Sequence, residues 1–376
     1  MSAMRHDVQH AAPSIWRDLV SHFLISRIVI ALIGFVGVAM FVDQHTLTIG
    51  GAIAFNPEVV WNKWDAVWYE RIARFGYAYQ VDDLKGQAAA GFFPLYPLTI
   101  GLLLKIVPSL SFFWVATIFS NVVSFIALWL VARAEATPAL ARRVLLVTCT
   151  AAGSFYLSIT YTEGLFLLLI VLTIVTTRRR MYLLAALIAG LAFATRVQGL
   201  AALAVPLIAC RLDDRLPMAA RYGRIALMAV VFAIPMGIHM AYLADVQGSA
   251  EAFVARQAMW DNAWPYPLKA LVGLIDFPKR TQGWLHGAYW FLYVGLIIRY
   301  WKQLPLGEAL FCLGAMLIST QQEAFHGIYR YVVPLVPIAT CLARDRDDVQ
   351  WTIIGINLVF GAIMILAFVT NNRLAV

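Results

Sequence analysis

The chain has 376 residues, of which 61% are hydrophobic and 13% are charged, and its formal net charge is +8 at pH 7. A soluble domain carries about 25% charged residues, so this composition excludes an ordinary soluble globular protein. The positive charge does not indicate nucleic-acid binding. The basic residues stand in short clusters between apolar segments, as the positive-inside rule describes for membrane proteins.

Apolar segments recur along the whole chain, many of them near the length of about 20 residues that a helix needs to cross a bilayer. They are continuous, whereas the strands of a membrane barrel alternate between apolar and polar residues. We therefore predict a single all-α polytopic membrane domain over residues 1–376, with about 8–11 transmembrane helices.

The first apolar segment runs from Phe23 to Val42 and follows a polar, partly basic stretch. It is too long for the core of a signal peptide, so we expect a spanning helix with a cytoplasmic N-terminus. Further spans or partial spans are predicted at 93–107, 111–132, 143–160, 162–177, 181–195, 199–210, 224–244, 284–300, 305–320, 328–342 and 351–370.

Clusters of arginine and lysine between these segments test the topology. They comprise Arg133, Arg142 and Arg143; Arg178, Arg179 and Arg180; Arg211, Arg215, Arg221 and Arg224; Arg299 and Lys302; and Arg344 and Arg346. All can face the cytoplasm if 93–107 turns back within the membrane and 181–210 forms a helical hairpin. The topology differs if 93–107 crosses fully. In the first arrangement the loops at 43–91 and 245–283 share the extracytoplasmic side.

The loop at 43–91 contains the stretch WNKWDAVWYERIARFGY, residues 61–77. Five of its apolar residues recur at spacings of three and four, namely Trp61, Trp64, Trp68, Ile72 and Phe75. On one helix they form an apolar stripe, which predicts an amphipathic helix lying along the membrane surface with its aromatic side in the lipid. Asp65 lies at the margin of that stripe. Its carboxylate either caps a surface helix or faces a substrate whose tail lies in lipid.

Three later stretches place single polar residues beside apolar segments. Glu163 in SITYTEG stands where a turn meets a new helix, and it serves either the helix dipole or a sugar or cation. Arg196 in ATRVQG is costly in an apolar stretch unless it reaches the interface or meets an anion such as phosphate. His326 and Arg330 in HGIYRYVVP share a helical face at a spacing of four, where both can donate to a phosphate. Plain anchoring of Arg330 and Tyr331 at the membrane edge is the alternative.

The four cysteines lie in or at the ends of apolar segments, and their spacing is not that of a metal site. We expect buried apolar side chains at these positions, which are Cys149, Cys210, Cys312 and Cys341.

Taken in order, five motifs carry a family resemblance. They are W-x-x-W-D-x-x-W-Y-x-x-I-A-x-x-G-Y from residue 61, F-F-P-L-Y-P from 92, Y-T-E-G-L-F from 161, T-R-x-x-G-L from 195 and R-Y-x-x-x-x-x-P from 330. Over about 62–337 the chain resembles the PIG-V-like mannosyltransferases, the family of the second mannosyltransferase of GPI-anchor assembly and its prokaryotic relatives, in the GT-C superfamily. The chain is shorter than the eukaryotic enzymes and is similar to a bacterial member.

The resemblance implies a GT-C-like bundle and an inverting glycosyltransferase in the bacterial inner membrane, with its active site on the periplasmic side. Its donor would be a polyprenyl-phosphate hexose, with mannose as the family's sugar, and its acceptor a lipid, glycan or protein hydroxyl. A transporter or flippase that moves a lipid or sugar without covalent transfer is the alternative.

The resemblance also implies roles for residues. Asp65 would be the general base, Tyr161 and Glu163 the family's Tyr-x-Glu pair that orients groups or contacts the sugar, and Arg196 and Arg330 its arginines. Further substrate contacts are expected at Trp64, Trp68, Tyr69, His326 and Tyr331. No cofactor is expected. A divalent metal stays open, because Asp65 has no acidic neighbour before Glu70.

Overall fold

The computed structural model describes residues 2–41, 48–49, 52–53, 56–78, 89–257, 270–271, 281–321, 325 and 327–372; for 2–14, 48–49, 52–53, 257 and 281–282 it describes the backbone alone. The described elements are α1 (Ser2–Phe41), β1 (Thr48–Ile49), β2 (Ala52–Ile53), α2 (Pro57–Trp61), α3 (Asp65–Phe75), η2 (Ala89–Gly91), α4 (Leu95–Ile106), α5 (Phe112–Ala134), α6 (Pro138–Thr150), η3 (Ala152–Leu157), α7 (Glu163–Arg178), α8 (Tyr182–Phe193), α9 (Gly199–Ala202), α10 (Ala204–Arg211), α11 (Met218–Gln247), α12 (Ala252–Gln257), α14 (Thr281–Tyr300), η5 (Trp301–Gln303), α15 (Leu306–Ile318), η6 (Ser319–Gln321), α16 (Ile328–Val332), α17 (Val336–Ala343) and α18 (Asp347–Val369).

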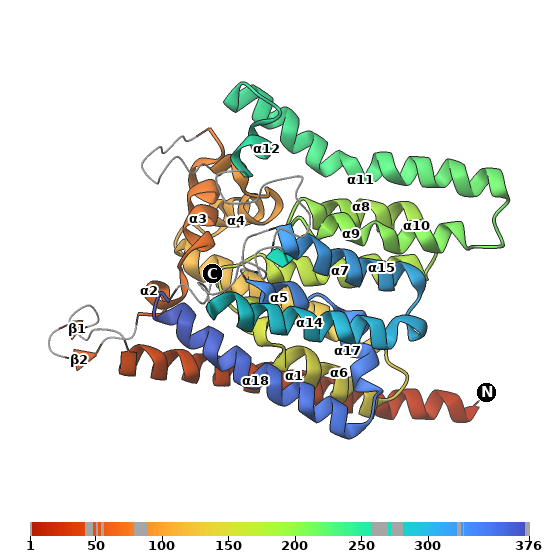
Figure 1. The fold of residues 1–376 in the computed structure, drawn as a ribbon, viewed down its shortest axis with the longest axis horizontal. Helices are drawn as coiled ribbons and strands as arrows, with labels where there is room; N and C mark the ends of the chain where they lie inside the picture. The colour runs from red at the N-terminus through yellow and green to blue at the C-terminus, as the bar shows by residue number, and fades with distance from the viewer. Residues whose placement is uncertain are drawn as a thin grey trace.

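The long helices lie side by side along the longest axis, so the bundle has two ends (Figure 1). Among the residues described, the two strands form one antiparallel pair of two residues each. We call the end with α2, α3, α4 and the start of α7 the loop end. We call the opposite end, with the turns that follow α5, α7, α10, α14 and α17, the arginine end.

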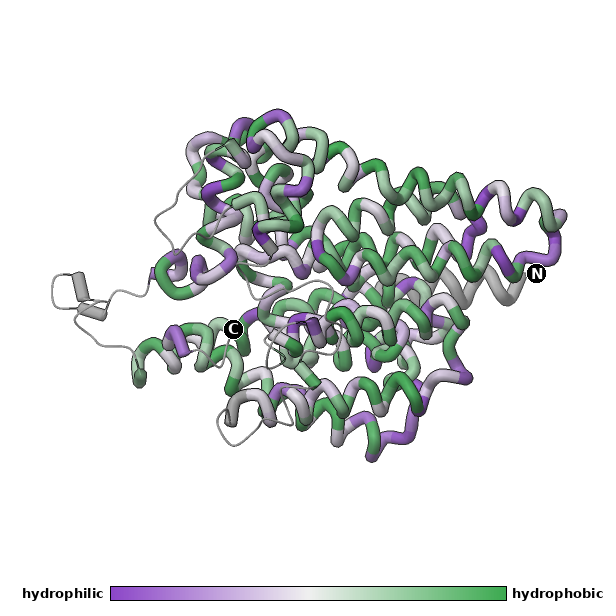
Figure 2. Tube along the Cα trace, turned by 45° about the horizontal axis from the view of Figure 1, so that its top comes forward, coloured by the Kyte–Doolittle hydropathy of each residue, from purple (hydrophilic) through white to green (hydrophobic). Residues whose placement is uncertain are grey.

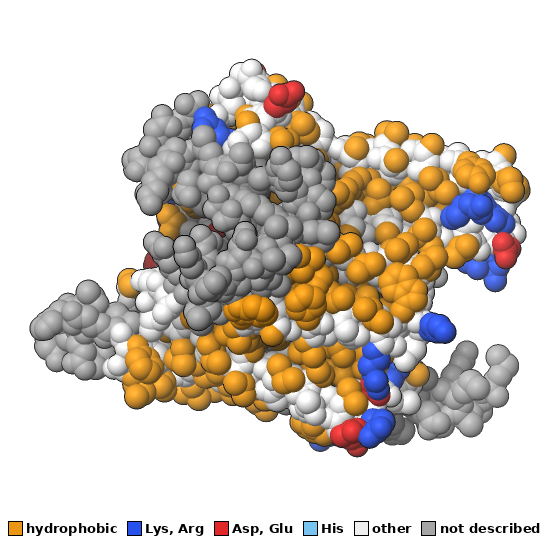
Figure 3. All heavy atoms as spheres, viewed as in Figure 1, with side chains coloured by type: hydrophobic (Ala, Val, Ile, Leu, Met, Phe, Trp, Pro, Cys, Tyr) orange, Lys and Arg blue, Asp and Glu red, His pale blue; other side chains and the backbone are white. Residues whose placement is uncertain are grey.

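Ion pairs tie these turns together at the arginine end. Arg344 meets Glu135 at 2.8 Å, which joins the turns after α17 and α5. Arg299 meets Asp345 at 2.8 Å, which joins the turn after α17 to the end of α14. On the face seen in Figure 3, apolar side chains cover the middle of the bundle, and Lys and Arg side chains gather at this end. The arrangement confirms that the arginine clusters share one end.

Four helices in the described part of the chain are long and apolar enough to cross a membrane, as a helical membrane protein requires. They are Ile15–Phe41 within α1, α5, α11 and α18. Figure 2 shows the same pattern, with hydrophobic colouring along the helices and hydrophilic colouring at turns. The total number of crossings stays a prediction.

Two predicted segments have the shapes that the first predicted topology needs, and the topology itself stays a prediction. With 12 residues, α4 is about 18 Å long, well below the roughly 30 Å of a hydrocarbon core. It lies beside α3 at the loop end (Figure 1). The segment 181–210 forms a hairpin, because α8 runs to the loop end and α9 and α10 return.

Several predicted spans differ in extent from the helices observed. The segment 199–210 divides into α9 and α10, because Pro206 lacks the N–H that would continue the helix. The segment 328–342 divides into α16 and α17 around Pro334 for the same reason, and 143–160 ends its α-helix at Thr150. All four cysteines are buried and free, as predicted.

Candidate functional site

Four charged side chains meet at the loop end, and we call them the ion cluster. Asp65 begins α3, Glu163 begins α7, Arg196 follows α8 and Arg330 lies in α16. Arg196 Nη1 lies 2.6 Å from Glu163 Oε1, and Arg330 Nη1 lies 2.9 Å from Asp65 Oδ2. Arg330 Nε also donates to Glu163 Oε1, so this arginine bridges both carboxylates.

The members of the ion cluster differ in their exposure. The side chain of Glu163 is 1% exposed, Arg196 10%, Arg330 16% and Asp65 28%. Buried charges are costly unless they are paired, and here two carboxylates offset two guanidinium groups. Asp65 is therefore the member that a substrate can reach most directly.

The start of α7 explains the place of Glu163. A carboxylate in the first turn of a helix is stabilised by the helix dipole. The next residue is Gly164, where a Cβ atom would lie 2.6 Å from Ser124 Oγ and 2.7 Å from Ser120 O. Glycine therefore lets α7 approach α5 closely directly behind the carboxylate. Thr162, the residue before Glu163, accepts a second hydrogen bond from Arg196 Nη1, at 3.0 Å.

Aromatic rings hold the two guanidinium groups. Arg330 lies over the rings of Tyr156 and Tyr161, 4.8 Å from each centroid, and Arg196 lies 5.4 Å from the ring of Tyr331. Such contacts stabilise a cation that has left water. Tyr331 is buried, so it belongs to the ion cluster's surroundings and is not an exposed anchor at a membrane edge.

The segment before Asp65 corrects one prediction. We expected Trp61 and Trp64 to share a helical stripe with Trp68, but α2 ends at Trp61 and α3 begins at Asp65. Between them Trp64 has φ 56° and ψ −120°. Tertiary hydrogen bonds explain the break, because Lys63 Nζ donates to Val369 O at 2.7 Å and Tyr161 donates to Lys63 O at 2.9 Å.

The apolar side of α3 also differs from the prediction. Trp68 and Ile72 are buried against the protein, and the ring of Trp68 stacks on Phe92 with centroids 5.6 Å apart. Only Phe75 of the expected stripe is exposed on this helix. The side that was expected to face lipid instead attaches α3 to the bundle, which fixes Asp65 at the start of the helix.

Tyr69 lies on α3 beside the ion cluster. Its ring meets those of Tyr96 and Tyr161 edge to face, with centroids 5.4 and 6.0 Å away. Burial raises the pKa of Tyr69, and the charge of Asp65 adds to this effect. The hydroxyl therefore stays protonated at neutral pH.

One expected site residue, His326, lies outside the described residues. The helix α16 begins at Ile328, after Gly327 with φ 64°. The helical face predicted for residues 326 and 330 therefore stays a prediction. Sequence reasoning also missed Tyr156, Thr162 and Gln198, whose Oε1 accepts from Arg196 Nε at 3.2 Å. Thr162 and Gln198 lie inside the motifs that begin at 161 and 195, and Tyr156 shortly precedes the first of these, so closeness to Glu163 and Arg196 was the available signal.

Within the described ranges, no group of three or more His, Cys, Asp and Glu side chains could hold a metal ion. Comparison of the chain with family models, with curated proteins and with solved structures found no match. The family resemblance therefore depends on the motifs themselves.

Proposed function

We propose that the protein is an inverting glycosyltransferase that moves a hexose, with mannose as the family's sugar, from a polyprenyl-phosphate donor to an acceptor hydroxyl. One observation carries the proposal: Asp65 and Arg330 stand 265 positions apart in the chain, yet they meet with Glu163 and Arg196 in one ion cluster. This transfer requires a carboxylate that accepts a proton and cations that stabilise a phosphate, and the cluster contains both.

The proposed reaction gives a step to Asp65 and to the two arginines of the ion cluster. Asp65 takes the proton of the acceptor hydroxyl while that oxygen forms a bond to the anomeric carbon of the donor. The bond from the anomeric carbon to the phosphate oxygen breaks, and its electron pair leaves with the polyprenyl phosphate. Arg330 and Arg196 stabilise the charge that develops on this leaving group. The proton on Asp65 then passes to water.

Donor binding also changes the cluster. Its charges are balanced without substrate, so an incoming phosphate must compete for a guanidinium group. The Asp65–Arg330 contact is the one to open, because Asp65 can reach water whereas Glu163 is buried. A carboxylate that loses its cation becomes a better proton acceptor. Phosphate binding would thereby activate the base only when the donor is present.

The proposed setting follows from the two ends of the bundle. If the arginine end faces the cytoplasm, as the positive-inside rule favours, the loop end faces the periplasm of a bacterial inner membrane. A polyprenyl carrier brings its phosphate and sugar to that membrane surface. The acceptor would be a lipid, a glycan or a protein that also reaches this surface.

Substitution of Asp65 by Asn tests the proposal in proteoliposomes that contain a radiolabelled polyprenyl-phosphate mannose. We expect transfer to a membrane acceptor to fall about 10²–10⁴-fold, the usual contribution of a general base. Glu251→Gln, which changes an exposed carboxylate after α11, is the matched control and should leave transfer unchanged. If Asp65→Asn transfers sugar at the wild-type rate, Asp65 is not the general base.

A lipid transporter or flippase is the second candidate. The observation in its favour is that α9–α10 and α16–α17 are interrupted beside the ion cluster, and interrupted helices form the binding sites of many transporters. Movement of a labelled polyprenyl phosphate across proteoliposomes, without any glycosylated product, would support it against the transferase.

A further inference from the structure

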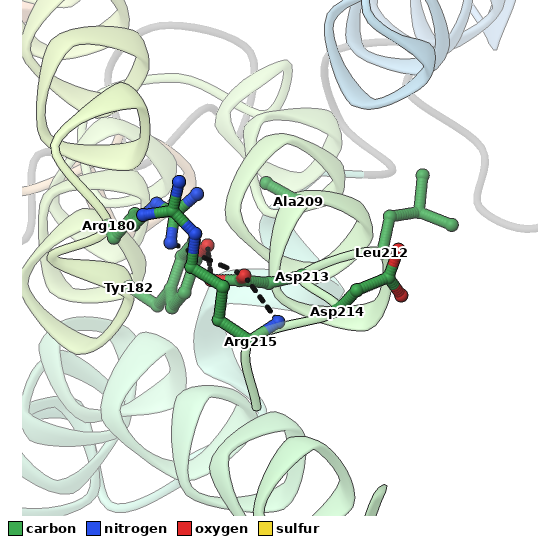
Figure 4. Close-up of a pocket in the computed structure, with 7 residues that line it drawn as sticks. All are labelled: Arg180, Tyr182, Ala209, Leu212, Asp213, Asp214 and Arg215. Carbon is green, nitrogen blue, oxygen red and sulfur yellow. Dashed lines mark hydrogen bonds and ion pairs between the residues drawn. The ribbon is translucent and has the colours of Figure 1, made fainter. Parts of the chain in front are cut away.

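A cavity of about 350 Å³ opens at the arginine end, remote from the ion cluster. It lies between the turn that joins α7 to α8 and the loop that joins α10 to α11. Its lining residues are Arg180, Tyr182, Ala209, Leu212, Asp213, Asp214 and Arg215 (Figure 4).

Asp213 organises the side chains of this cavity. Tyr182 donates its hydroxyl to Asp213 Oδ2 at 2.8 Å, and the backbone N–H of Arg215 donates to Oδ1 at 3.2 Å. Arg180 Nη1 approaches Oδ1 at 3.5 Å (Figure 4). The hydrogen bond from Tyr182 lowers the pKa of Asp213, so the carboxylate stays ionised. Its charge attracts the guanidinium group of Arg180, which also lines the cavity.

The cavity keeps unused positive charge. The 3.5 Å contact of Arg180 is too long for a strong hydrogen bond, so most donors of this guanidinium group are available. Arg215 is exposed, and its part in holding Asp213 comes from its backbone. Asp214 also lines the cavity, and its carboxylate pairs with Arg221, which is not a lining residue, at 3.2 Å. The lining therefore carries two guanidinium groups and two carboxylates, of which Asp213 contacts Arg180 and Asp214 is offset by Arg221.

The backbone supports a specific role for Arg180. Its φ of 60° is left-handed, a conformation that favours glycine or asparagine. Arg180 adopts this conformation despite that preference, and its side chain lines the cavity. Leu212 gives the lining an exposed apolar side chain, and two further exposed apolar residues, Met181 and Met218, lie close by in the sequence, in the α7–α8 turn and at the start of α11.

We propose that this cavity binds the phosphodiester headgroup of an anionic membrane lipid. Guanidinium groups match phosphate oxygens in geometry and charge, and the apolar rim would contact the acyl chains. Basic cavities between membrane helices on the cytoplasmic side are known to receive such headgroups. A bound lipid would hold the α7–α8 turn against the α10–α11 loop.

Native mass spectrometry of the full chain in detergent, titrated with phosphatidylglycerol or phosphatidylcholine, tests the proposal. Wild type should prefer phosphatidylglycerol, and Arg180→Gln/Arg215→Gln should bind it at least about tenfold more weakly, as the loss of a charge-assisted contact predicts. Arg133→Gln/Arg346→Gln removes two positive charges from the same end and should bind within about twofold of wild type. Equal retention by the cavity variant and wild type would overturn the proposal.

Two further measurements separate folding and ligand source. The single variant Arg215→Gln keeps the hydrogen bond from the backbone N–H of residue 215 to Asp213. It should therefore elute from a size-exclusion column as wild type does and still lose part of the preference for phosphatidylglycerol. Inorganic phosphate should compete with the lipid only weakly, because it lacks the acyl chains that meet the rim. If inorganic phosphate displaces the lipid at equal concentration, the cavity takes a free anion and the lipid assignment is wrong.

Discussion

The two ends of the bundle use the same residue types in opposite ways. At the arginine end, Arg178 pairs with Glu308 at 2.8 Å, and the guanidinium group stays about half exposed while the carboxylate is buried. The pairs Arg299–Asp345 and Arg344–Glu135 follow the same pattern. At the loop end, by contrast, both arginines of the ion cluster are mostly buried, and Arg330 serves two carboxylates.

The difference teaches what each end can do. A half-exposed arginine is hydrated when its partner is lost, so breaking such a pair lowers the free energy of unfolding only slightly. A buried arginine cannot reach water in this way, and the desolvation of a buried cluster is costly. Proteins keep costly buried charge where a ligand or a reaction uses it, which is why we assign function to the loop end.

The largest expected effect contrasts Glu163→Gln with Glu308→Gln. Loss of the Glu163 charge leaves two buried arginines with only Asp65 as an anion, and we expect about 3–5 kcal/mol lower free energy of unfolding. Glu308→Gln should cost about 1 kcal/mol or less, since Arg178 can reach water. Unfolding by SDS in detergent measures both. Equal losses would show that the two ends do not differ in this way.

Next in size is the effect of Arg330→Gln on transfer. We expect sugar transfer to fall about 10²–10³-fold, as when one group that stabilises charge in a transition state is removed. Arg344→Gln, which breaks an ion pair at the arginine end, should leave transfer within about twofold. The assay is transfer of label from a polyprenyl-phosphate mannose. A similar loss in both variants would point to a general defect in folding.

A smaller effect concerns competition between Asp65 and phosphate for Arg330. Asp65→Asn removes the competing charge, so this variant should bind polyprenyl phosphate about threefold to tenfold more tightly than wild type, which corresponds to about 0.7–1.4 kcal/mol. Tryptophan fluorescence during titration with the lipid measures the affinity. Weaker binding by Asp65→Asn would mean that Asp65 supports phosphate binding and does not compete with it.

The smallest effect is the pH dependence of the pair Arg299–Asp345. Hydrogen bonds from Arg299 hold the pKa of Asp345 well below its usual range, so its contribution to stability is present above the unfolded pKa of about 3.9 and is lost as the pH falls further. Asp345→Asn should therefore lower the melting temperature slightly at pH 7, and the difference should shrink below about pH 4. A difference that grows in acid would contradict this assignment.

The sequence predicted the membrane class and the placement of charge, because apolar length and arginine clusters are local features. It also indicated Asp65, Glu163, Arg196 and Arg330 separately, and the structure brings these four together. It did not predict the break between Trp61 and Asp65. That break depends on two hydrogen bonds, one from Lys63 to Val369 across 306 positions and one from Tyr161 to Lys63 across 98 positions. No local pattern contains such contacts.

The cavity at the arginine end was missed for a related reason. Arg180 and Arg215 were interpreted as topology signals, and their convergence on Asp213 depends on how two separate turns meet. The stripe on α3 shows the same limit, since a spacing of three and four identifies an apolar side but not whether lipid or protein covers it.

The hydrogen bond from Lys63 to Val369 has a consequence for how the molecule is made. The carbonyl that secures the segment before Asp65 belongs to the last turn of α18, 306 positions later in the chain. During synthesis, the segment that carries Asp65 therefore leaves the ribosome long before its anchor exists. Asp65 can take up its final position only after nearly the whole bundle has been inserted. A partly synthesised chain in the membrane would therefore have no ordered ion cluster.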